Sequence, residues 1–241
     1  MISISGCYTA TNTSYSTITH ERYDEAVALT GAERNLNNFE KIQLSGNFKS
    51  TIIPSDSSNI TIKGDDADRV LTVVEDEVLY VEQEQRLGFF TRSPQVELII
   101  ESPLEITEMR LTGSNDTHLV NGDNLRYLKL SGSTRIKADE IDTDSLSIRE
   151  TGSSRIEANG FADELEMRLS GSSRIQAEHL KSEKPIIRTG GSSRVTLFVS
   201  EELNVRSSGS ANVYYDGSPS KVETQTSGSS RVQPLEKMSG K

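Results

Sequence analysis

Apolar and polar residues alternate at a step of two around a glycine that recurs along most of the chain. Apolar residues stand four positions before the glycine (Met109, Leu128, Ile148, Met167, Ile187, Val205), four after it (Ile136, Ile156, Ile175, Val195, Val213, Val232), and mostly also six after it (Leu119, Ala138, Ala158, Ala177, Leu197, Tyr215). Side chains of a strand point alternately to opposite faces, so this period predicts β-strands. The Gly, Ser, Thr and β-branched content disfavours helices of the same length.

The glycine opens a repeated phrase of the form Gly-Ser-Ser-Arg-Ile. Close copies begin at Gly132, Gly152, Gly171, Gly191 and Gly228, and weaker ones at Gly46, Gly113 and Gly209. From Gly113 onward the glycines are 19, 20, 19, 20, 18 and 19 residues apart. Such regular spacing is typical of a solenoid. We predict an all-β, single-stranded, right-handed parallel β-helix with coils of about 19 residues, in which the glycine allows a tight bend. A left-handed hexapeptide helix would require multiples of six.

The regularity of the pattern divides the chain into four segments. Residues 1–35 are rich in Ser and Thr without a clear period and are expected to be a tether or the remnant of an export signal. Residues 36–108 predict irregular or antiparallel strands that cap the N-terminal end of the solenoid. The regular coils occupy residues 109–233, and residues 234–241 form a tail.

Net charge and cysteine content limit the classes of partner. The formal net charge is −10, which argues against a nucleic-acid partner because binding phosphates requires a basic face. No apolar run approaches the roughly 20 residues of a spanning helix. The single cysteine, Cys7, closes the segment Ile4-Ser5-Gly6-Cys7, which has the form of a bacterial lipobox. Cys7 is therefore a candidate for lipidation and membrane anchoring, and the alternative is a free thiol in a tail.

Arginines recur on both sides of the glycine. Arg135, Arg155, Arg174, Arg194 and Arg231 stand three positions after it, and Arg110, Lys129, Arg149, Arg168, Arg188 and Arg206 three before it. Stacked coils would turn each series into a row of like charges that repel one another, with acids such as Glu166 and Asp139 available to offset them. The first series is a candidate ligand site for an acidic glycan or a surface protein, because guanidinium groups match carboxylates and sulfates. The alternative is a solvated face that deters aggregation.

The serines of the repeat have a simpler interpretation. Ser133, Ser153, Ser172, Ser192 and Ser229 directly follow the glycine. We expect them to stack in the tight corner and to form local hydrogen bonds.

Two other classes of function stay open. Some parallel β-helices are pectin lyase-like enzymes that act on polysaccharides, and acids such as Asp142, Asp163 and Glu183 lie on one side of successive coils, where calcium could bind. Coils this short leave little room for cleft-forming loops, and His20, His118 and His179 occupy unrelated positions, so we predict no catalytic residues, metal site or cofactor. Self-assembly of the solenoid into a structural polymer is the third class.

The order of short phrases resembles the head GIN domain family over roughly residues 36 to 233. The phrases are Phe39-Glu40-Lys41-Ile42 with Ser45-Gly46, Val78-Leu79-Tyr80-Val81, Val213-Tyr214-Tyr215-Asp216-Gly217-Ser218-Pro219, and Ser227-Gly228-Ser229. Members are bacterial envelope proteins labelled auto-transporter adhesins. The resemblance implies a right-handed β-helix, export and often a lipoprotein signal, but little about activity. From the residues we predict a non-catalytic interaction role, at the outer membrane, at the cell surface or in the periplasm. Arg after Gly-Ser-Ser departs from relatives, which often carry Gly or an acidic residue there.

Overall fold

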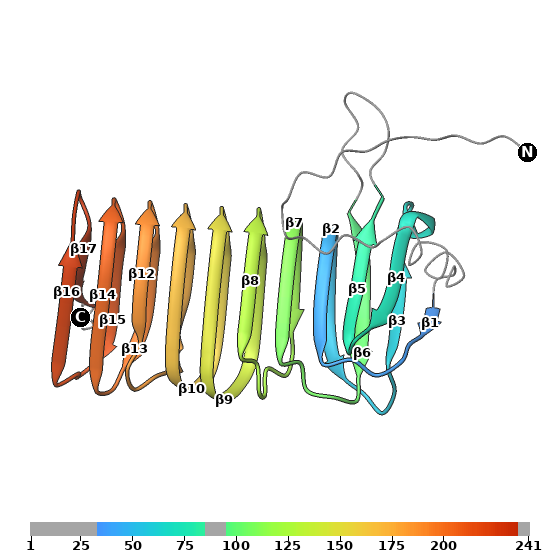
Figure 1. Cartoon of the computed structure of the whole chain (residues 1–241), viewed down its shortest axis with the longest axis horizontal. Helices are drawn as coiled ribbons and strands as arrows, with labels where there is room; N and C mark the ends of the chain where they lie inside the picture. The colour runs from blue at the N-terminus through green and yellow to red at the C-terminus, as the bar shows by residue number, and fades with distance from the viewer. Residues whose placement is uncertain (1–32, 85–94, 236–241) are drawn as a thin grey trace, which may run out of the picture.

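The computed structural model describes residues 33–84 and 95–235, and it confirms the predicted all-β solenoid. Two sheets lie face to face along the whole length of the molecule, and each coil contributes neighbouring strands to both (Figure 1). The strands are β1 Glu33–Asn35, β2 Lys41–Pro54, β3 Asn59–Lys63, β4 Val70–Glu75, β5 Val78–Gln83, β6 Val96–Ser102, β7 Glu108–Leu119, β8 Tyr127–Gly132, β9 Arg135–Gly152, β10 Arg155–Gly171, β11 Arg174–Lys181, β12 Ile186–Gly191, β13 Arg194–Val199, β14 Glu202–Gly209, β15 Asn212–Gly217, β16 Lys221–Thr226 and β17 Arg231–Pro234. A short 3-10 helix spans Ala67–Arg69.

Each regular coil rises through a near sheet, bends at the glycine and descends through a far sheet. In the near sheet β8, β12, β14 and β16 are joined by the second halves of β9 and β10, and all these strands pair in parallel. The far sheet contains β11, β13, β15 and β17 with the first halves of β9 and β10. The glycine bends therefore form one straight edge, the upper edge in Figure 1.

The glycine bend depends on two properties of that residue. Gly152 has a φ of +130°, which side-chain-bearing residues rarely adopt, and a Cβ there would lie 2.4 Å from the carbonyl oxygen of Gly132. The same carbonyl accepts a 2.8 Å hydrogen bond from the Ser153 backbone N–H. The close approach of neighbouring coils at this edge thus requires glycine in each of them.

The apolar columns that the sequence predicts form the core between the sheets. The residues four before and four after the glycine are buried from Met109 to Val213, as Ile148 and Ile156 illustrate with 1% and 0% exposure, whereas Val232 in the last coil is only partly buried. Small and large residues share the column six after the glycine, where Ala158 and Leu197 are also buried. Phe39 and Phe48 fill the wider N-terminal end.

The N-terminal end is closed by antiparallel strands, as predicted. β1 pairs with β3, β3 with β6, and β4 with β5, all antiparallel. The strand β2 nevertheless has the full geometry of a coil, because it pairs in parallel with β7 over its length and places Gly46 opposite Gly113. The sequence pattern around Gly46 therefore marks a coil whose structural neighbour, at Gly113, lies 67 residues further along the chain.

The C-terminal end is open and polar. Every residue of β16 is exposed, and its inward register positions hold Val222, Thr224 and Thr226 next to Leu203, Val205 and Ser207 of β14. Terminal repeats of solenoids commonly replace core residues by polar ones in this way, because their outer side meets water.

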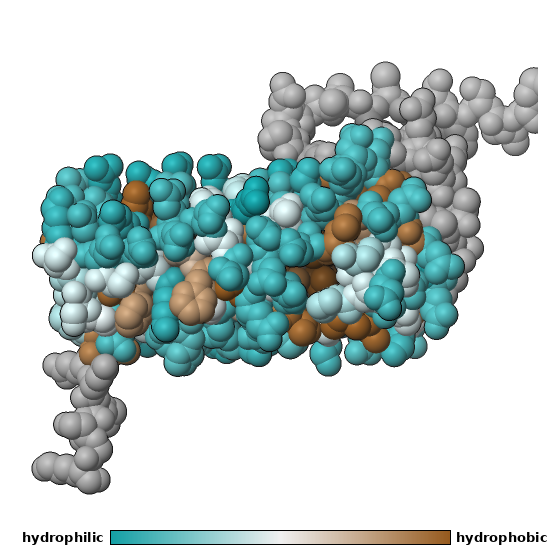
Figure 2. Space-filling model, turned by 90° about the horizontal axis from the view of Figure 1, so that it is seen from below, coloured by the Kyte–Doolittle hydropathy of each residue, from teal (hydrophilic) through white to brown (hydrophobic). Residues whose placement is uncertain are grey.

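The edge opposite the glycines is mostly hydrophilic along the regular coils, whereas apolar surface gathers near the N-terminal end (Figure 2). There a small cleft of about 150 Å³ lies among Ile53, Pro103 and Leu104. Across the described ranges no helix has the length and apolar character needed to cross a membrane.

Candidate functional site

A polar groove of about 640 Å³ follows the glycine edge across the regular coils. Its lining repeats from coil to coil as a serine, a second hydroxyl residue and an arginine. The repeated residues are Ser133, Thr134, Arg135, Ser153, Ser154, Arg155, Ser172, Ser173, Arg174, Ser192, Ser193 and Arg194, with Asp116 at one end and Asn212 at the other. We call this the serine–arginine groove.

The arginines of the groove form one row in the far sheet. Arg135 is opposite Arg155, Arg155 opposite Arg174, and Arg174 opposite Arg194 in the parallel register. Asn212 follows Arg194 in this row, and Arg231 stands one coil further on, outside the groove lining. Four of the five candidate arginines of the sequence therefore line one surface, and the fifth is separated from them by an asparagine.

The row is only partly neutralised. Arg135 donates a 3.0 Å hydrogen bond to Asp116 in an ion pair whose two side chains are about half exposed. Within the described part of the chain, the side chains of Arg155, Arg174 and Arg194 form neither an ion pair nor a hydrogen bond. Three consecutive guanidinium groups thus face the groove without a counter-charge.

The two hydroxyl residues of each coil differ in environment. The first serines, such as Ser153 and Ser172, are exposed and form no side-chain hydrogen bond among the described residues, so the predicted local bonding of this series is wrong. The second residues are buried instead, and the Thr134 and Ser154 hydroxyl oxygens lie 2.8 Å apart. Both residues lie in the bend between two strands, and only the second, two positions before the buried residue that stands four after the glycine, continues the inward alternation of the strand that follows.

A buried carboxylate lies beneath the same edge. Glu150 is 1% exposed and accepts a hydrogen bond from the Ser173 hydroxyl, while its Oε1 has no partner among the described residues. Burial raises the pKa of Glu150, although hydrogen bonds from Ser173 and Ser154 oppose the shift. Sequence reasoning missed this position, which lies two before the glycine and is filled by Leu130 and Leu169 in the adjacent coils.

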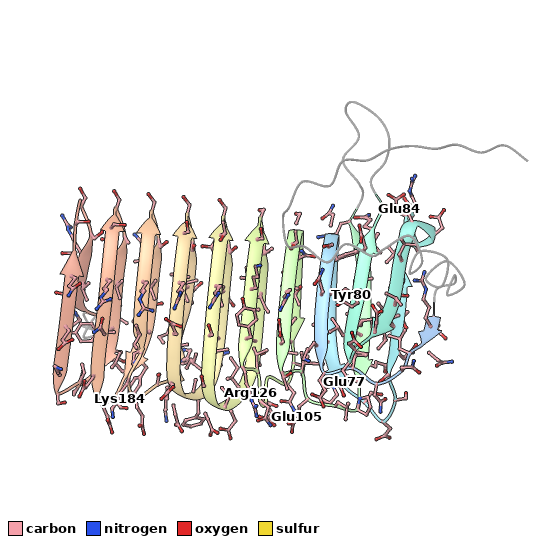
Figure 3. All side chains as sticks on the ribbon, viewed as in Figure 1. Glu77, Tyr80, Glu84, Glu105, Arg126 and Lys184 are labelled. Atoms are coloured by element: carbon pink, nitrogen blue, oxygen red, sulfur yellow. The ribbon has the colours of Figure 1, made fainter. Side chains whose placement is uncertain are left out.

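The second arginine row lies in the near sheet and is better compensated. Arg149, Arg168, Arg188 and Arg206 stack in register along a shallow groove of about 570 Å³. Figure 3 shows such nitrogen-bearing side chains in a row across the near strands. Glu166 accepts hydrogen bonds from both Arg168 and Arg188, as the sequence allowed, and these lower its pKa although burial acts in the opposite direction. Arg149 lies 5.7 Å from the ring centre of Tyr127.

Asp139 organises a polar cluster on the far sheet. It accepts hydrogen bonds from Lys137, from His118 Nε2 at 2.9 Å and from Asn159 Nδ2 at 2.7 Å. Partial burial would raise the pKa of Asp139, but these hydrogen bonds lower it to about 2. Among the residues described, no three His, Cys, Asp or Glu side chains converge as metal ligands, so the acids considered for calcium are not brought together.

The opposite edge carries charged side chains, some of which are held by hydrogen bonds or an ion pair. Glu105, Arg126 and Lys184 project from it (Figure 3). Asn124 donates to Glu105 and accepts a 3.5 Å contact from Arg126, and Lys184 forms a 3.2 Å ion pair with Glu201. The candidate lipidation residue Cys7 and His20 lie outside the described residues.

Solved structures of two bacterial proteins have the same fold. The chain superposes on an adhesin-labelled protein of Bacteroides fragilis NCTC 9343 with a TM-score of 0.72 at 20% identity, covering 84% of this chain and 95% of that one. A protein of Parabacteroides distasonis ATCC 8503, titled as a putative lipid binding protein, gives 0.62 at 20% identity, covering 85% and 95%. At these identities the likeness shows the fold alone.

The sequence comparisons are more specific. No curated protein matches the chain. The family model described as "Putative auto-transporter adhesin, head GIN domain" matches residues 38–219, which extend from the N-terminal cap through β15 and include the whole serine–arginine groove. The chain therefore belongs to the head GIN domain family of adhesin-labelled proteins.

Proposed function

We propose that this chain is a non-catalytic, adhesin-like protein of the bacterial envelope that binds an acidic, linear glycan in the serine–arginine groove. The observation that carries the proposal is the run of Arg155, Arg174 and Arg194, whose guanidinium groups have no counter-charge in the described part of the chain. The adhesin label of the family supports a surface interaction role, and the ligand is inferred from the groove alone.

Electrostatics supports an anionic ligand. Neighbouring parallel strands lie about 4.8 Å apart, and two unit charges at that distance in water repel by about 1 kcal/mol. A polyanion lying along the row would relieve this repulsion and accept charge-assisted hydrogen bonds from each guanidinium. The overall charge of −10 does not oppose this, because screening over a Debye length of about 8 Å makes the local row dominant.

Hydroxyl groups support a glycan among the polyanions. The exposed serines, such as Ser153, Ser172 and Ser192, run parallel to the arginine row and have free donor and acceptor capacity among the described residues. A sugar polymer presents hydroxyl groups beside its acidic groups, so both rows of the groove would find partners. The groove thus suits an alcohol-rich polyanion better than a simple polyphosphate.

The acids in the groove support binding without cleavage. Glycoside hydrolysis uses two carboxyl groups on either side of the scissile bond. Asp116 is the only carboxylate in the groove lining among the described residues, and it is bound to Arg135. A lipid anchor at Cys7 would hold the solenoid at the outer membrane or cell surface, with the Ser- and Thr-rich stretch between Cys7 and β1 as tether.

Binding to a glycan array tests the proposal. We expect the full chain to bind acidic linear glycans, with weaker binding at higher salt and no requirement for calcium. Arg155→Ala with Arg174→Ala should lower affinity about 100-fold, at about tenfold per lost charged hydrogen bond. The control is Arg149→Ala with Arg206→Ala, which removes the same charge from the near sheet.

Three outcomes would overturn the proposal. Binding restricted to neutral glycans or to proteins would refute the acidic-glycan ligand, and equal losses in the two double variants would show a general charge effect. Release of shorter or unsaturated sugars from a bound polyuronate would instead establish the enzymatic alternative.

A further inference from the structure

We infer that the serine–arginine groove selects glycans with one acidic group on every sugar residue, and that its binding site spans three consecutive sugars. This inference rests on the proposed function, because it names the ligand of the same groove. It is based on the row of arginines without a counter-charge, Arg155, Arg174 and Arg194, and on the two residues that end this row.

The first end is set by Asp116. Asp116 stands opposite Arg135 in the register between β7 and β9, and the two side chains form the 3.0 Å ion pair. Its carboxylate therefore occupies the guanidinium that would bind a fourth acidic group, and it repels any polyanion that extends past Arg155. Both side chains of this pair are about half exposed, so the pair contributes little to stability and its removal should not unfold the coil.

The second end is set by Asn212. Asn212 occupies the arginine position between Arg194 and Arg231 in the far sheet. Its side chain is shorter than arginine and carries no charge, so the electrostatic row stops after Arg194. The groove lining ends at the same residue and does not reach Arg231.

The near-sheet row shows that uncompensated charge is not a general property of the coils. In that row Glu166 bridges Arg168 and Arg188, and Tyr127 lies beneath Arg110 and Arg149 at 5.9 and 5.7 Å. Only the far-sheet row leaves three consecutive guanidinium groups available in the described residues. The site is therefore distinguished from its surroundings by charge as well as by position.

The spacing of the row matches a fully charged glycan. The arginines are one strand apart, about 4.8 Å, and each guanidinium ends a flexible side chain, so acidic groups that recur on every unit of an extended polymer can pair with successive arginines. A polymer with an acid on every ring can engage Arg155, Arg174 and Arg194 together. A polymer with acids on alternate rings leaves the middle arginine unpaired and should lose about tenfold in affinity, the equivalent of one charged hydrogen bond.

Defined oligouronates provide the test. For the full chain we expect affinity to rise about tenfold with each unit up to the trimer and then to level off. An oligosaccharide with the same number of acids on alternate rings should bind about tenfold more weakly than the matched oligouronate. Isothermal calorimetry at one fixed salt concentration measures both series.

Two variants should move the end of the site. Asp116→Asn releases Arg135, so the plateau should shift from the trimer to the tetramer. Asn212→Arg joins Arg194 to Arg231 and should shift the plateau to the tetramer or beyond. Asp144→Asn makes the same charge change as Asp116→Asn at an exposed position outside the groove lining, and it should leave the plateau at the trimer.

The outcomes separate the inference from the proposed function. If no oligouronate binds at any length, the acidic-glycan function itself is wrong. If oligouronates bind but affinity keeps rising beyond the trimer, or Asp116→Asn and Asp144→Asn behave alike, the function stands and the three-sugar site is refuted. Equal affinity for the two acid spacings would refute the selection for a charge on every ring.

Discussion

Neutralising Glu150 should stabilise the protein at neutral and alkaline pH. This carboxylate is 1% exposed, and its Oε1 lacks a hydrogen-bond partner in the described part of the chain. Burying a charge that is only partly hydrogen-bonded costs more than burying a neutral polar group of the same shape. Glu150→Gln keeps the shape and the acceptor for the Ser173 hydroxyl while removing the buried charge, so its free energy of unfolding at about pH 8 should exceed that of the wild type by about 1–3 kcal/mol.

The pH dependence gives the sign of the effect. Burial raises the folded-state pKa of Glu150 above its usual value of 4.5, so protonation favours the folded chain. The stabilising contribution is complete below pH 4.5 and is lost as pH rises through the folded-state pKa. The advantage of Glu150→Gln should therefore be largest at alkaline pH and disappear near pH 4.5.

Urea unfolding of wild type, Glu150→Gln and a control at several pH values measures this difference. The control is Glu164→Gln, an exposed position on β10 with the same change of charge, whose unfolding midpoint should follow the wild type. Glu150→Leu places a third leucine between Leu130 and Leu169 and should show the same pH trend. Its gain in stability should be smaller, because the Ser173 hydroxyl loses its hydrogen-bond acceptor. A variant that is less stable than wild type at alkaline pH, or a gain independent of pH, would refute the reasoning.

Two further predictions concern the bend and the Asp139 cluster. Gly191→Ala should lower the free energy of unfolding by at least about 1–3 kcal/mol, because the φ of Gly191 is +101° and the new Cβ would lie 2.5 Å from the Gly171 oxygen. The control is Gly190→Ala, whose Cβ would meet only Ser208 Oγ at 3.5 Å and which should be neutral or slightly stabilising. Similar melting temperatures for the two variants would contradict this. Asp139→Asn should lower the free energy of unfolding by about 1–2 kcal/mol at neutral pH. This difference in stability from wild type should vanish as pH falls from 3.8 through about 2, where the carboxylate of the wild type becomes protonated. Acid unfolding of both proteins followed by circular dichroism would detect it.

The sequence predicted the regular coils well because their information is local and repeated. The alternation around Gly152 specifies both the strand period and the buried positions of Ile148 and Ile156. The arginine rows follow directly from that register. The match of Gly46 with Gly113 was also predictable, since both glycines sit in the same phrase although about a full cap segment separates them.

Sequence reasoning failed where a single residue departs from its column or where a contact crosses coils. A glutamate is expected at the surface from its residue type, and only the register shows that Glu150 points inward beside Ser173. The pairing of Asp116 with Arg135 joins a weak copy of the repeat to a strong one. Both residues stand three positions after a repeat glycine, so the register predicts that they are neighbours, but sequence reasoning did not consider the acid together with the arginine series. The choice between exposed and buried serines required the exact position of the bend, which alternation alone leaves uncertain by one residue.

The stacked glycine bends make the length of the arginine row depend on the number of coils. Each bend fits only against the bend before it, so a coil inserted or removed as a whole leaves the neighbouring bends unchanged. Tandem duplication of one coil that carries Gly-Ser-Ser-Arg would add one guanidinium to the row at the same spacing, without altering any existing contact of the core. In such a fold the length of ligand that the row can bind evolves in whole units of one coil, while the chemistry of each unit stays constant.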